Sequence, residues 1–503
     1  MNLIKNNFVG YQTILAVVFV VVATSSGFSQ GVNPPETSKT GPNILFIAID
    51  DLNSWIGSMG MHGQTKTPNI DRLAQMGVLF ENAHCQAPLC GPSRASLMSG
   101  LRPSTTGIYG MIDDEKIVHD NAATKDVVFL PEYFKKEGYH TMGIGKLFHE
   151  HAPKGQFHDS GGRVRGFGPT PEKRFVWEGF AGDNYGRTGT DWGAYPMADS
   201  LMPDYQSAQW AAERLKRDYD RPFFLAVGFL RPHAPWYVPQ QWFDLHPVET
   251  LEMPPYKPDD LEDVPQVALK INDLPMMPTT DWAIETDNWK YIIQGYLACI
   301  SFVDAQVGKL LEALENSPYA DNTIVVLWSD HGYRLGEKGT FAKHALWEEA
   351  TKSPLIFSGP GIPGGKVVDE PVELLSIYPT LVELASLPKN NFNEGTSLVP
   401  LLKGTDAERE WMALTTYGMK NHAIRTKRYR YIQYEDGTEE FYDHANDPNE
   451  WYNLWDDEKY LNIKEEIKKH LPKTNAPWAR HSSYSFQPYF VDQKERSDKG
   501  LIK

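Results

Sequence analysis

Long apolar runs, basic residues and cysteines are all scarce in this sequence. The apolar run at residues 14–23 is too short for a comfortable membrane span, which needs about 20 apolar residues. The 49 basic residues are outnumbered by 65 acidic ones, for a net charge of −16. Such a surface disfavours nonspecific binding to nucleic acid or to anionic membranes. An anionic substrate would need a few cations gathered in a cleft.

The first thirty residues have the pattern of a secretory signal peptide. Lys5 precedes the apolar run, and small residues follow it at 24–29, as in the three regions of such a peptide. We expect residues 1–29 to be removed and the protein to be exported, to the periplasm or beyond the cell. No cysteine follows the run, which argues against a lipid anchor. The shortness of the run disfavours an uncleaved N-terminal anchor, and we expect no stable membrane insertion.

The cysteine count is odd, which leaves at least one thiol unpaired in an exported protein. One interpretation is a disulfide between Cys85 and Cys90, with Cys299 buried and inert. The other is that modification removes Cys90 from the thiols altogether. The sequence favours modification, because Gly-Pro-Ser-Arg at 91–94 gives Cys90 a specific context.

The apolar pattern predicts an α/β sandwich with a mainly parallel central sheet. Expected strands lie at 43–49, 141–144, 223–227, 323–327 and 355–357, and expected helices at 68–76, 206–217, 289–315 and 373–386. Thr67 is expected to cap the first helix, Pro68 to begin it and Gly77 to end it.

The chain of 503 residues is long enough for two domains. We expect a disordered leader at 30–42 and a catalytic domain at 43–402. Within that domain, residues 150–200 and 235–282 show little periodicity and are expected to be long loops, the first forming a wall that faces the substrate.

The last part of the chain, residues 405–485, is predicted to form a small subdomain with an antiparallel sheet. Short alternating strands are expected at 423–426, 429–432 and 440–442, with a turn at Asp436-Gly437 and a closing helix at 458–470.

Acidic residues follow two of the predicted strands. Asp50 and Asp51 follow one, and Asp330 and His331 follow another. Ligands of open α/β sheets bind beyond the carboxyl ends of strands, so these side chains are expected to meet. Three clustered carboxylates repel one another unless a cation neutralises them, and a hard divalent ion does this best. Each aspartate alone could equally cap a helix or a turn.

The sequence Cys-Gly-Pro-Ser-Arg at 90–94 resembles the maturation motif of type I sulfatases. Further segments resemble the iduronate 2-sulfatase-like members, and they lie at 48–53, 145–149, 232–235, 329–332 and 443–450. The resemblance covers roughly residues 41–450. It implies an alkaline-phosphatase-like fold and the hydrolysis of sulfate esters.

In that family a maturase oxidises the cysteine to formylglycine (3-oxoalanine). The resemblance therefore implies that Cys90 becomes formylglycine and that the protein needs a formylglycine-generating maturase. It also implies one Ca²⁺ ion, with Asp50, Asp51, Cys90, Asp330 and His331 as its ligands. In many members of that family, an asparagine occupies the position that corresponds to His331. Arg94 would orient the hydrated aldehyde and help to ionise it.

The remaining catalytic roles also come from the resemblance. Lys146 and Lys343 would bind the sulfate, His149 would orient the hydrated aldehyde, and His233 would protonate the departing sugar oxygen. Lys146 and His149 are expected to share one helical face. In this mechanism, one hydroxyl of the hydrated aldehyde would attack sulfur. The second hydroxyl would then expel the sulfate and restore the aldehyde. Serine has a single hydroxyl, so it could be sulfated but not cleared by this route.

The resemblance implies a sulfated carbohydrate substrate without naming it. Ulvan, an algal polymer with iduronate and sulfated rhamnose, is favoured over 2-O-sulfated uronic acid of glycosaminoglycans. Trp55, Trp177, Trp192 and Trp236 could stack on sugar rings, although large aromatic residues more often belong to the core. The alternatives are a phosphonate or phosphate-ester hydrolase with the same superfamily site, and an inactive binder of sulfated glycans whose Cys90 is never modified.

Overall fold

The computed structural model describes residues 41–119, 122–177, 190–405 and 409–502. The predicted signal peptide and nearly all of the predicted leader lie outside these ranges. Within them, no helix combines the length and the apolarity that crossing a membrane requires.

One large sheet dominates the described chain. Its strand order is β10-β2-β9-β8-β1-β6-β3-β4, with β11 paired to β2. The strands are β1 (Asn43–Ile49), β2 (Gly77–His84), β3 (His140–Gly145), β4 (Asp159–Gly162), β6 (Phe223–Phe229), β8 (Thr323–Ser329), β9 (Lys352–Ser358), β10 (Lys366–Val368) and β11 (Val372–Glu373). Only the pairs made by β9 are antiparallel within this sheet. The prediction of a mainly parallel sheet is confirmed.

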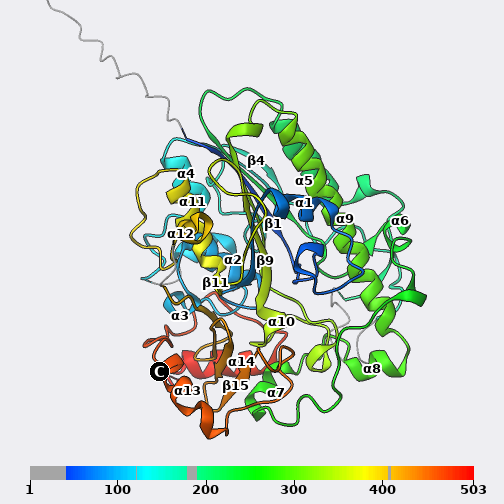
Figure 1. Ribbon diagram of the computed structural model, residues 1–503, viewed down its shortest axis with the longest axis vertical. Coiled ribbons are helices and arrows are strands. Elements are labelled where there is room, and N and C mark those ends of the chain that lie inside the picture. Colours follow the sequence, from blue (N-terminus) through cyan, green and yellow to red (C-terminus); the bar gives the residue numbers. More distant parts are fainter. Residues whose placement is uncertain (1–40, 120–121, 178–189, 406–408, 503) are drawn as a thin grey trace, which may run out of the picture. The chain divides into compact units, whose positions relative to one another are not determined.

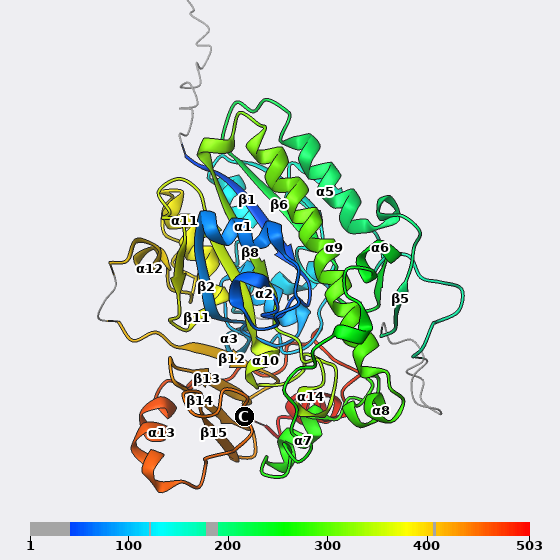
Figure 2. The same cartoon turned by 45° about the vertical axis from the view of Figure 1, so that its right-hand side comes forward.

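Helices cover both faces of the sheet (Figures 1 and 2). Alternate residues of β1 enter two different cores: Leu45 and Ile47 lie in one, Phe46 and Ala48 in the other. The first core includes residues of α1 (Pro68–Met76), α5 (Pro203–Arg214) and α9 (Trp289–Glu315). The second core includes residues of α2 (Cys90–Ser99), α4 (Leu130–Lys136), α11 (Ile377–Leu384) and α12 (Val399–Lys403). Because β1 is buried on both sides, its sequence is continuously apolar.

Three predicted helices differ in detail from those observed. α1 has the predicted bounds, but the Thr67 side chain does not cap it. Its hydroxyl instead accepts from Gly57 N at 2.8 Å and donates to Asp71 at 3.2 Å. α5 begins and ends three residues earlier than expected, with Pro203 as its first residue. The expected helix 373–386 is a 3₁₀ turn followed by α11.

The two segments predicted as long loops contain short elements. They include β5 (Trp192–Ala194) and β7 (Trp236–Val238), which pair with each other, and α6 (Gln240–Phe243), α7 (Gln266–Asn272) and the start of α8 (Thr280–Glu285). Residues 178–189 of the predicted wall lie outside the described residues. The other short helices are α3 (Pro103–Thr106), α10 (Glu348–Thr351) and the 3₁₀ turns Gly57–Met59, Asp114–His119, Asp199–Leu201, Val248–Thr250, Ala320–Asn322, Glu337–Gly339, Leu374–Ser376 and Glu458–Tyr460.

A separate four-stranded antiparallel sheet lies near the C-terminus, as predicted. Its strands are β12 (Ala413–Thr416), β13 (His422–Arg425), β14 (Tyr429–Gln433) and β15 (Glu439–Asp443). The closing helix is α13 (Leu461–Lys468), and a further helix, α14 (Pro488–Asp498), lies beyond the predicted subdomain. β12 was not predicted from the sequence.

Candidate active site

The register of the main sheet brings the candidate residues to one edge. β8, β1, β6 and β3 are parallel neighbours, and Ile49 at the end of β1 pairs with both Ser329 and Phe229. Gly145 at the end of β3 pairs with Gly228. The residues that follow these strands are Asp50, Asp51, Lys146, His233, Asp330 and His331. They therefore leave the sheet side by side, as the strand-end argument predicts.

Asp50, Asp51 and Asp330 are completely buried, with at most 1% of each exposed. Asp51 has a left-handed backbone with φ of 62°, which an aspartate rarely adopts. Asp51 N donates to Asp330 Oδ1 at 3.1 Å, and the Tyr296 hydroxyl donates to Asp51 O at 2.7 Å. These bonds hold the strained turn, so that both consecutive carboxylates enter the site.

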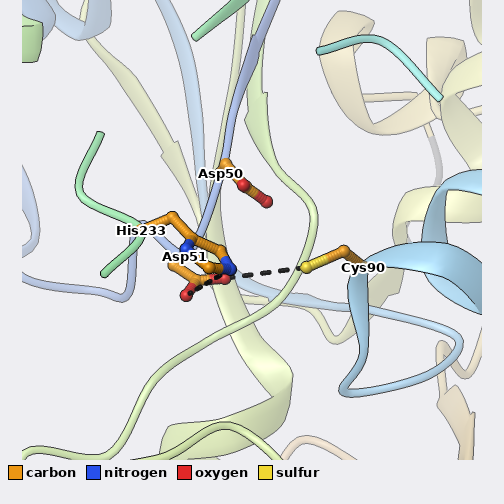
Figure 3. Close-up of side chains that lie close together, drawn as sticks. All are labelled: Asp50, Asp51, Cys90 and His233. Atoms are coloured by element: carbon orange, nitrogen blue, oxygen red, sulfur yellow. Dashed lines mark hydrogen bonds and ion pairs between the residues drawn. The ribbon is translucent and has the colours of Figure 1, made fainter. Parts of the chain in front are cut away.

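Cys90 is the first residue of α2, a helix whose residues are all buried. Its Sγ lies 3.0 Å from Lys343 Nζ and 3.4 Å from His331 Nε2. It also lies 3.8 Å from Asp51 Oδ1 (Figure 3). The positive N-terminus of a helix favours an anion at this point. Cys85 and Cys90 form no disulfide, and all three cysteines are free and buried. The disulfide interpretation is therefore wrong for this structure.

The three buried carboxylates lie close to three cationic side chains. Lys146 Nζ lies 2.5 Å from Asp50 Oδ2, Lys343 Nζ 2.7 Å from Asp51 Oδ1, and Arg94 Nε 2.8 Å from Asp330 Oδ2. The three positive charges balance the three negative ones, as burial requires. Arg94 Nη1 also donates to Lys146 O at 2.6 Å, so that Arg94 joins α2 to the end of β3.

The donor set fits a hard divalent cation. Ligand atoms of Asp50, Cys90, Asp330 and His331 lie within 4.8 Å of one another, and so do those of Asp50, Asp51, Cys90 and His233. Asp50 Oδ1 has only a 3.4 Å contact with Arg94, and Asp51 Oδ2 only a 3.8 Å contact with His233. Two carboxylate oxygens thus remain available, and oxygen is the donor that Ca²⁺ or Mg²⁺ prefers.

The two consecutive aspartates differ in acidity because their neighbours differ. Burial alone would raise the pKa of Asp50, but Lys146, Arg94 and Lys343 outweigh it and hold that pKa well below the ordinary value. Burial raises the pKa of Asp51 to about 7, and the charges of Asp50 and Asp330 add to this against Lys343. Without a bound cation, Asp51 therefore holds a proton near neutral pH.

Cys90, His331 and His233 are neutral at pH 7. Burial and the charge of Asp50 raise the pKa of the Cys90 thiol to about 12. Burial lowers the pKa of His331 to about 4, and burial with Lys343 lowers that of His233 well below its ordinary value. An unmodified Cys90 would thus stay a thiol and would be a poor nucleophile.

His233 is held by an aromatic neighbour that the sequence did not reveal. Its ring stacks on Phe167 with centroids 4.1 Å apart and an interplanar angle of 7°. Its Nδ1 lies 2.5 Å from Ala234 O, which leaves Nε2 facing Asp51. Arg231 donates to both Phe167 O and His233 O, at 2.8 and 3.1 Å. The predicted wall thus reaches the site, through Phe167.

The predicted helical face for Lys146 and His149 is wrong. Gly145 has φ of +80°, and an added Cβ would lie 1.9 Å from Gly228 O. The chain bends after this glycine without forming a helix. The Asp114 carboxylate accepts from the backbone N–H groups of the next residues, His149, Glu150 and His151, at 3.0–3.2 Å. These bonds replace helical ones and leave the His149 side chain 23% exposed. Within the described residues, no hydrogen bond joins it to Cys90.

Asp114 should therefore matter for activity although it lies outside the site. We expect Asp114→Asn to lower the free energy of unfolding by about 1–3 kcal/mol, because its amide cannot accept all three backbone bonds. We also expect kcat/KM to fall, because the loop carries Lys146. The exposed neighbour Asp113 supplies the matched control: Asp113→Asn should change neither quantity. Denaturant unfolding measures the free energy of unfolding, and steady-state kinetics measure kcat/KM. If Asp114→Asn behaved like Asp113→Asn in both measurements, the role of Asp114 in holding this loop would be contradicted.

The tryptophans proposed to stack on sugars belong to the core. Trp55, Trp177, Trp192 and Trp236 are 0–4% exposed, so none offers a free face. Tyr296 and Asn53, which support Asp51, were also missed as site residues. Asn53 N donates to the Tyr296 hydroxyl at 2.9 Å, a contact across 243 residues that no local pattern indicates.

A second cluster of possible metal ligands is already neutralised by arginines. Glu348, His444 and Glu450 also place ligand atoms within 4.8 Å of one another. Arg425 Nε lies 3.0 Å from Glu348 and Arg430 Nε 2.6 Å from Glu450. These ion pairs join α10 to the small sheet, and both ring nitrogens of His444 already have partners, Glu450 Oε1 at 2.9 Å and Arg425 Nη2 at 3.1 Å.

Comparison with known families gives two matches. The profile described as "Sulfatase" matches residues 42–387, and the one described as "N-sulphoglucosamine sulphohydrolase, C-terminal" matches residues 336–476. The two ranges overlap and together cover most of the chain.

Individual relatives agree with these matches. A sulfatase from Formosa agariphila is 62% identical over 92% of both chains. Human iduronate 2-sulfatase is 33% identical over 69% of both chains. Among solved structures, a 2-O GAG sulfatase is 25% identical and superposes with a TM-score of 0.65, over 92% of this chain and 94% of the other. The predicted resemblance and the alkaline-phosphatase-like fold class are confirmed.

Proposed function

The chain belongs to the sulfatase family of sulfuric ester hydrolases, and we propose that it is an exported polysaccharide sulfatase whose nucleophile is a formylglycine made from Cys90. The observation that carries this proposal is the position of Cys90. Its side chain lies at the N-terminus of a buried helix, between Lys343 and His331 and beside three buried carboxylates. The raised pKa of the thiol supports a chemistry that does not use the thiolate.

We propose that the site holds one Ca²⁺ ion. Its ligands would come from Asp50, Asp51, Asp330, His331 and modified Cys90. A bound Ca²⁺ supplies a positive charge that polarises the sulfate oxygens. The carboxylates are fixed in place before any ion binds, because Arg94, Lys146 and the backbone of Asp51 already hold them.

The residues around Cys90 suit the binding and cleavage of a sulfate ester. Lys146 and Lys343 would neutralise the sulfate oxygens, and buried ammonium groups do this more strongly than exposed ones. The hydrated formylglycine supplies the attacking hydroxyl, and Arg94 keeps α2 in place through its bonds to Asp330 and to Lys146 O.

His233 is the residue placed to protonate the leaving oxygen. Its ring is fixed between Phe167 and the carbonyl of Ala234, and its side chain is 16% exposed. It therefore lies between the buried carboxylates and the solvent side from which a sugar must enter. Burial leaves the imidazole neutral in the free protein, so it would gain its proton when the sulfate ester binds, because a nearby anion favours the charged form of histidine.

We propose a uronate-containing sulfated polysaccharide as the substrate. Two of the similar proteins carry names that specify an iduronate 2-sulfatase and a 2-O GAG sulfatase, which supports a sulfated uronic acid. Ulvan and the glycosaminoglycans both contain uronic acids, and the two sources are to be separated by experiment.

The first test combines mass spectrometry with sulfate release. The natively exported protein should lack residues 1–29, and its peptide around Cys90 should be lighter by the thiol-to-aldehyde change. Sulfate should then be released from ulvan oligosaccharides or from 2-O-sulfated glycosaminoglycan disaccharides. A modified protein that turns over phosphomonoesters faster than sulfate esters would identify the phosphate-ester hydrolase. An unmodified Cys90 with glycan binding and no release would identify the inactive binder.

A further inference from the structure

His344 follows the proposed sulfate-binding Lys343 and has an unusual backbone. Its φ is 32°, a positive value that residues other than glycine rarely adopt. The side chain is buried, with 3% exposed. A strained conformation next to a site residue persists only if the surroundings hold it.

Tyr484 stabilises this conformation of His344. Its hydroxyl lies 2.7 Å from His344 Nε2, and the two rings stack with centroids 5.3 Å apart and an interplanar angle of 21°. His344 Nδ1 has no hydrogen-bond partner within the described part of the chain. The bond to Tyr484 is therefore the one that orients this imidazole there.

Tyr484 belongs to a segment that is anchored beside Cys90. Met111 and Ser483 exchange two backbone hydrogen bonds, at 2.8 and 2.9 Å. Met111 in turn lies against Gly91, where an added Cβ would be 2.9 Å from its Sδ. The start of α2 and Tyr484 are thus joined through the segment around Met111. Both matched family profiles end before Tyr484, at residues 387 and 476.

Lys343 is fixed from its other side by Arg334. The buried guanidinium donates through Nη2 to Lys343 O at 3.1 Å and through Nε to Ala342 O at 3.0 Å. Arg334 fixes the carbonyl of Lys343, and Tyr484 fixes the residue that follows. Between these two points, the ammonium group lies 2.7 Å from Asp51 and 3.0 Å from Cys90.

We propose that Tyr484 is a positioning residue that acts through His344 to hold Lys343 beside Cys90 and thereby sets the affinity for sulfate. This inference rests on the proposed role of Lys343 in binding sulfate. Tyr484 need not touch the substrate, because the bond to His344 is its connection to the site. The C-terminal segment is then part of the active site although it lies outside both matched profiles.

The test is Tyr484→Phe, which removes the hydroxyl and keeps the stacked ring. We expect the holoenzyme variant to bind inorganic sulfate about tenfold more weakly, the size of one buried hydrogen bond, and kcat/KM for the polysaccharide to fall similarly. Tyr489→Phe is the matched control, because Tyr489 lies on the same segment and bonds Glu435 and Asn421 instead. That variant should keep the affinity for sulfate. Calorimetry with inorganic sulfate and the melting temperature are measured for both.

A double-mutant cycle tests the route through His344. Asparagine tolerates positive φ, so His344→Asn should fold while losing the contact with Tyr484. In that background, Tyr484→Phe should have no further effect on sulfate binding. The proposal is overturned if Tyr484→Phe binds sulfate as tightly as the wild type, or if it lowers affinity no more than Tyr489→Phe does. A wild-type enzyme that releases no sulfate would instead overturn the proposed function.

Discussion

Replacing Cys90 with alanine should abolish sulfate release and leave the fold intact. We expect the rate to fall by about 10⁴-fold or more, as it does when a covalent nucleophile is removed. The melting temperature should change little, because Lys343 keeps its 2.7 Å ion pair with Asp51 and Arg94 keeps its bond to Asp330. The measurements are sulfate release by ion chromatography and thermal unfolding, both on protein co-expressed with a maturase.

Cys299→Ala is the matched control for this loss. Cys299 is also buried and free, in the middle of α9. Its replacement should lower the free energy of unfolding by about 1 kcal/mol and leave the activity unchanged. Cys90→Ser adds a finer test, because its single hydroxyl should accept one sulfo group and then stall, which intact-mass measurement detects. An active Cys90→Ala enzyme would end the assignment of the nucleophile.

Removal of the metal ion should have the second largest effect. We expect chelation to lower the activity about 10³-fold, the several kcal/mol that a bound cation contributes to a transition state. The melting temperature should also fall, because an ion at a thousand times its Kd stabilises the fold by about 4 kcal/mol. Added Ca²⁺ should restore both quantities. Elemental analysis should find one ion per chain.

Two variants show which of the two clusters holds the ion. Asp51→Asn should lower the metal content to near zero, because it removes an oxygen donor that no neighbour replaces. His444→Asn should leave the metal content unchanged, because both ring nitrogens of His444 are already engaged by Glu450 and Arg425. If His444→Asn lost the metal ion and Asp51→Asn kept it, the ion would be bound by the second cluster.

The proposed metal site should also depend on pH in a defined direction. The pKa of Asp51 is raised to about 7 by burial and by Asp50 and Asp330. A cation must displace the proton that Asp51 holds below that pH. Ca²⁺ affinity should therefore weaken as the pH falls from 8 to 6. Calorimetric titrations at several pH values measure it.

The sequence alone determined the strands that build the site and much of what they carry. β1 and β8 are buried on both faces, so their apolar runs are uninterrupted and their ends are marked by Asp50 and Asp330. The motif around Cys90 indicated its chemistry, because a short, specific set of neighbours surrounds it. α9 was predicted at its observed bounds, since 27 residues give a helical period ample length to show.

Only the tertiary structure decided how those residues are held. The loop after Lys146 is shaped by Asp114, His233 is stacked on Phe167, and His344, which follows Lys343, is bonded to Tyr484. The tryptophans that could have met a sugar are buried instead. Strand ends and motifs are local in the chain, so the sequence displays them. A hydrogen bond between His344 and Tyr484 spans 140 residues, and such a contact exists only once the register of the sheet and the path of the C-terminal segment have brought its two ends together.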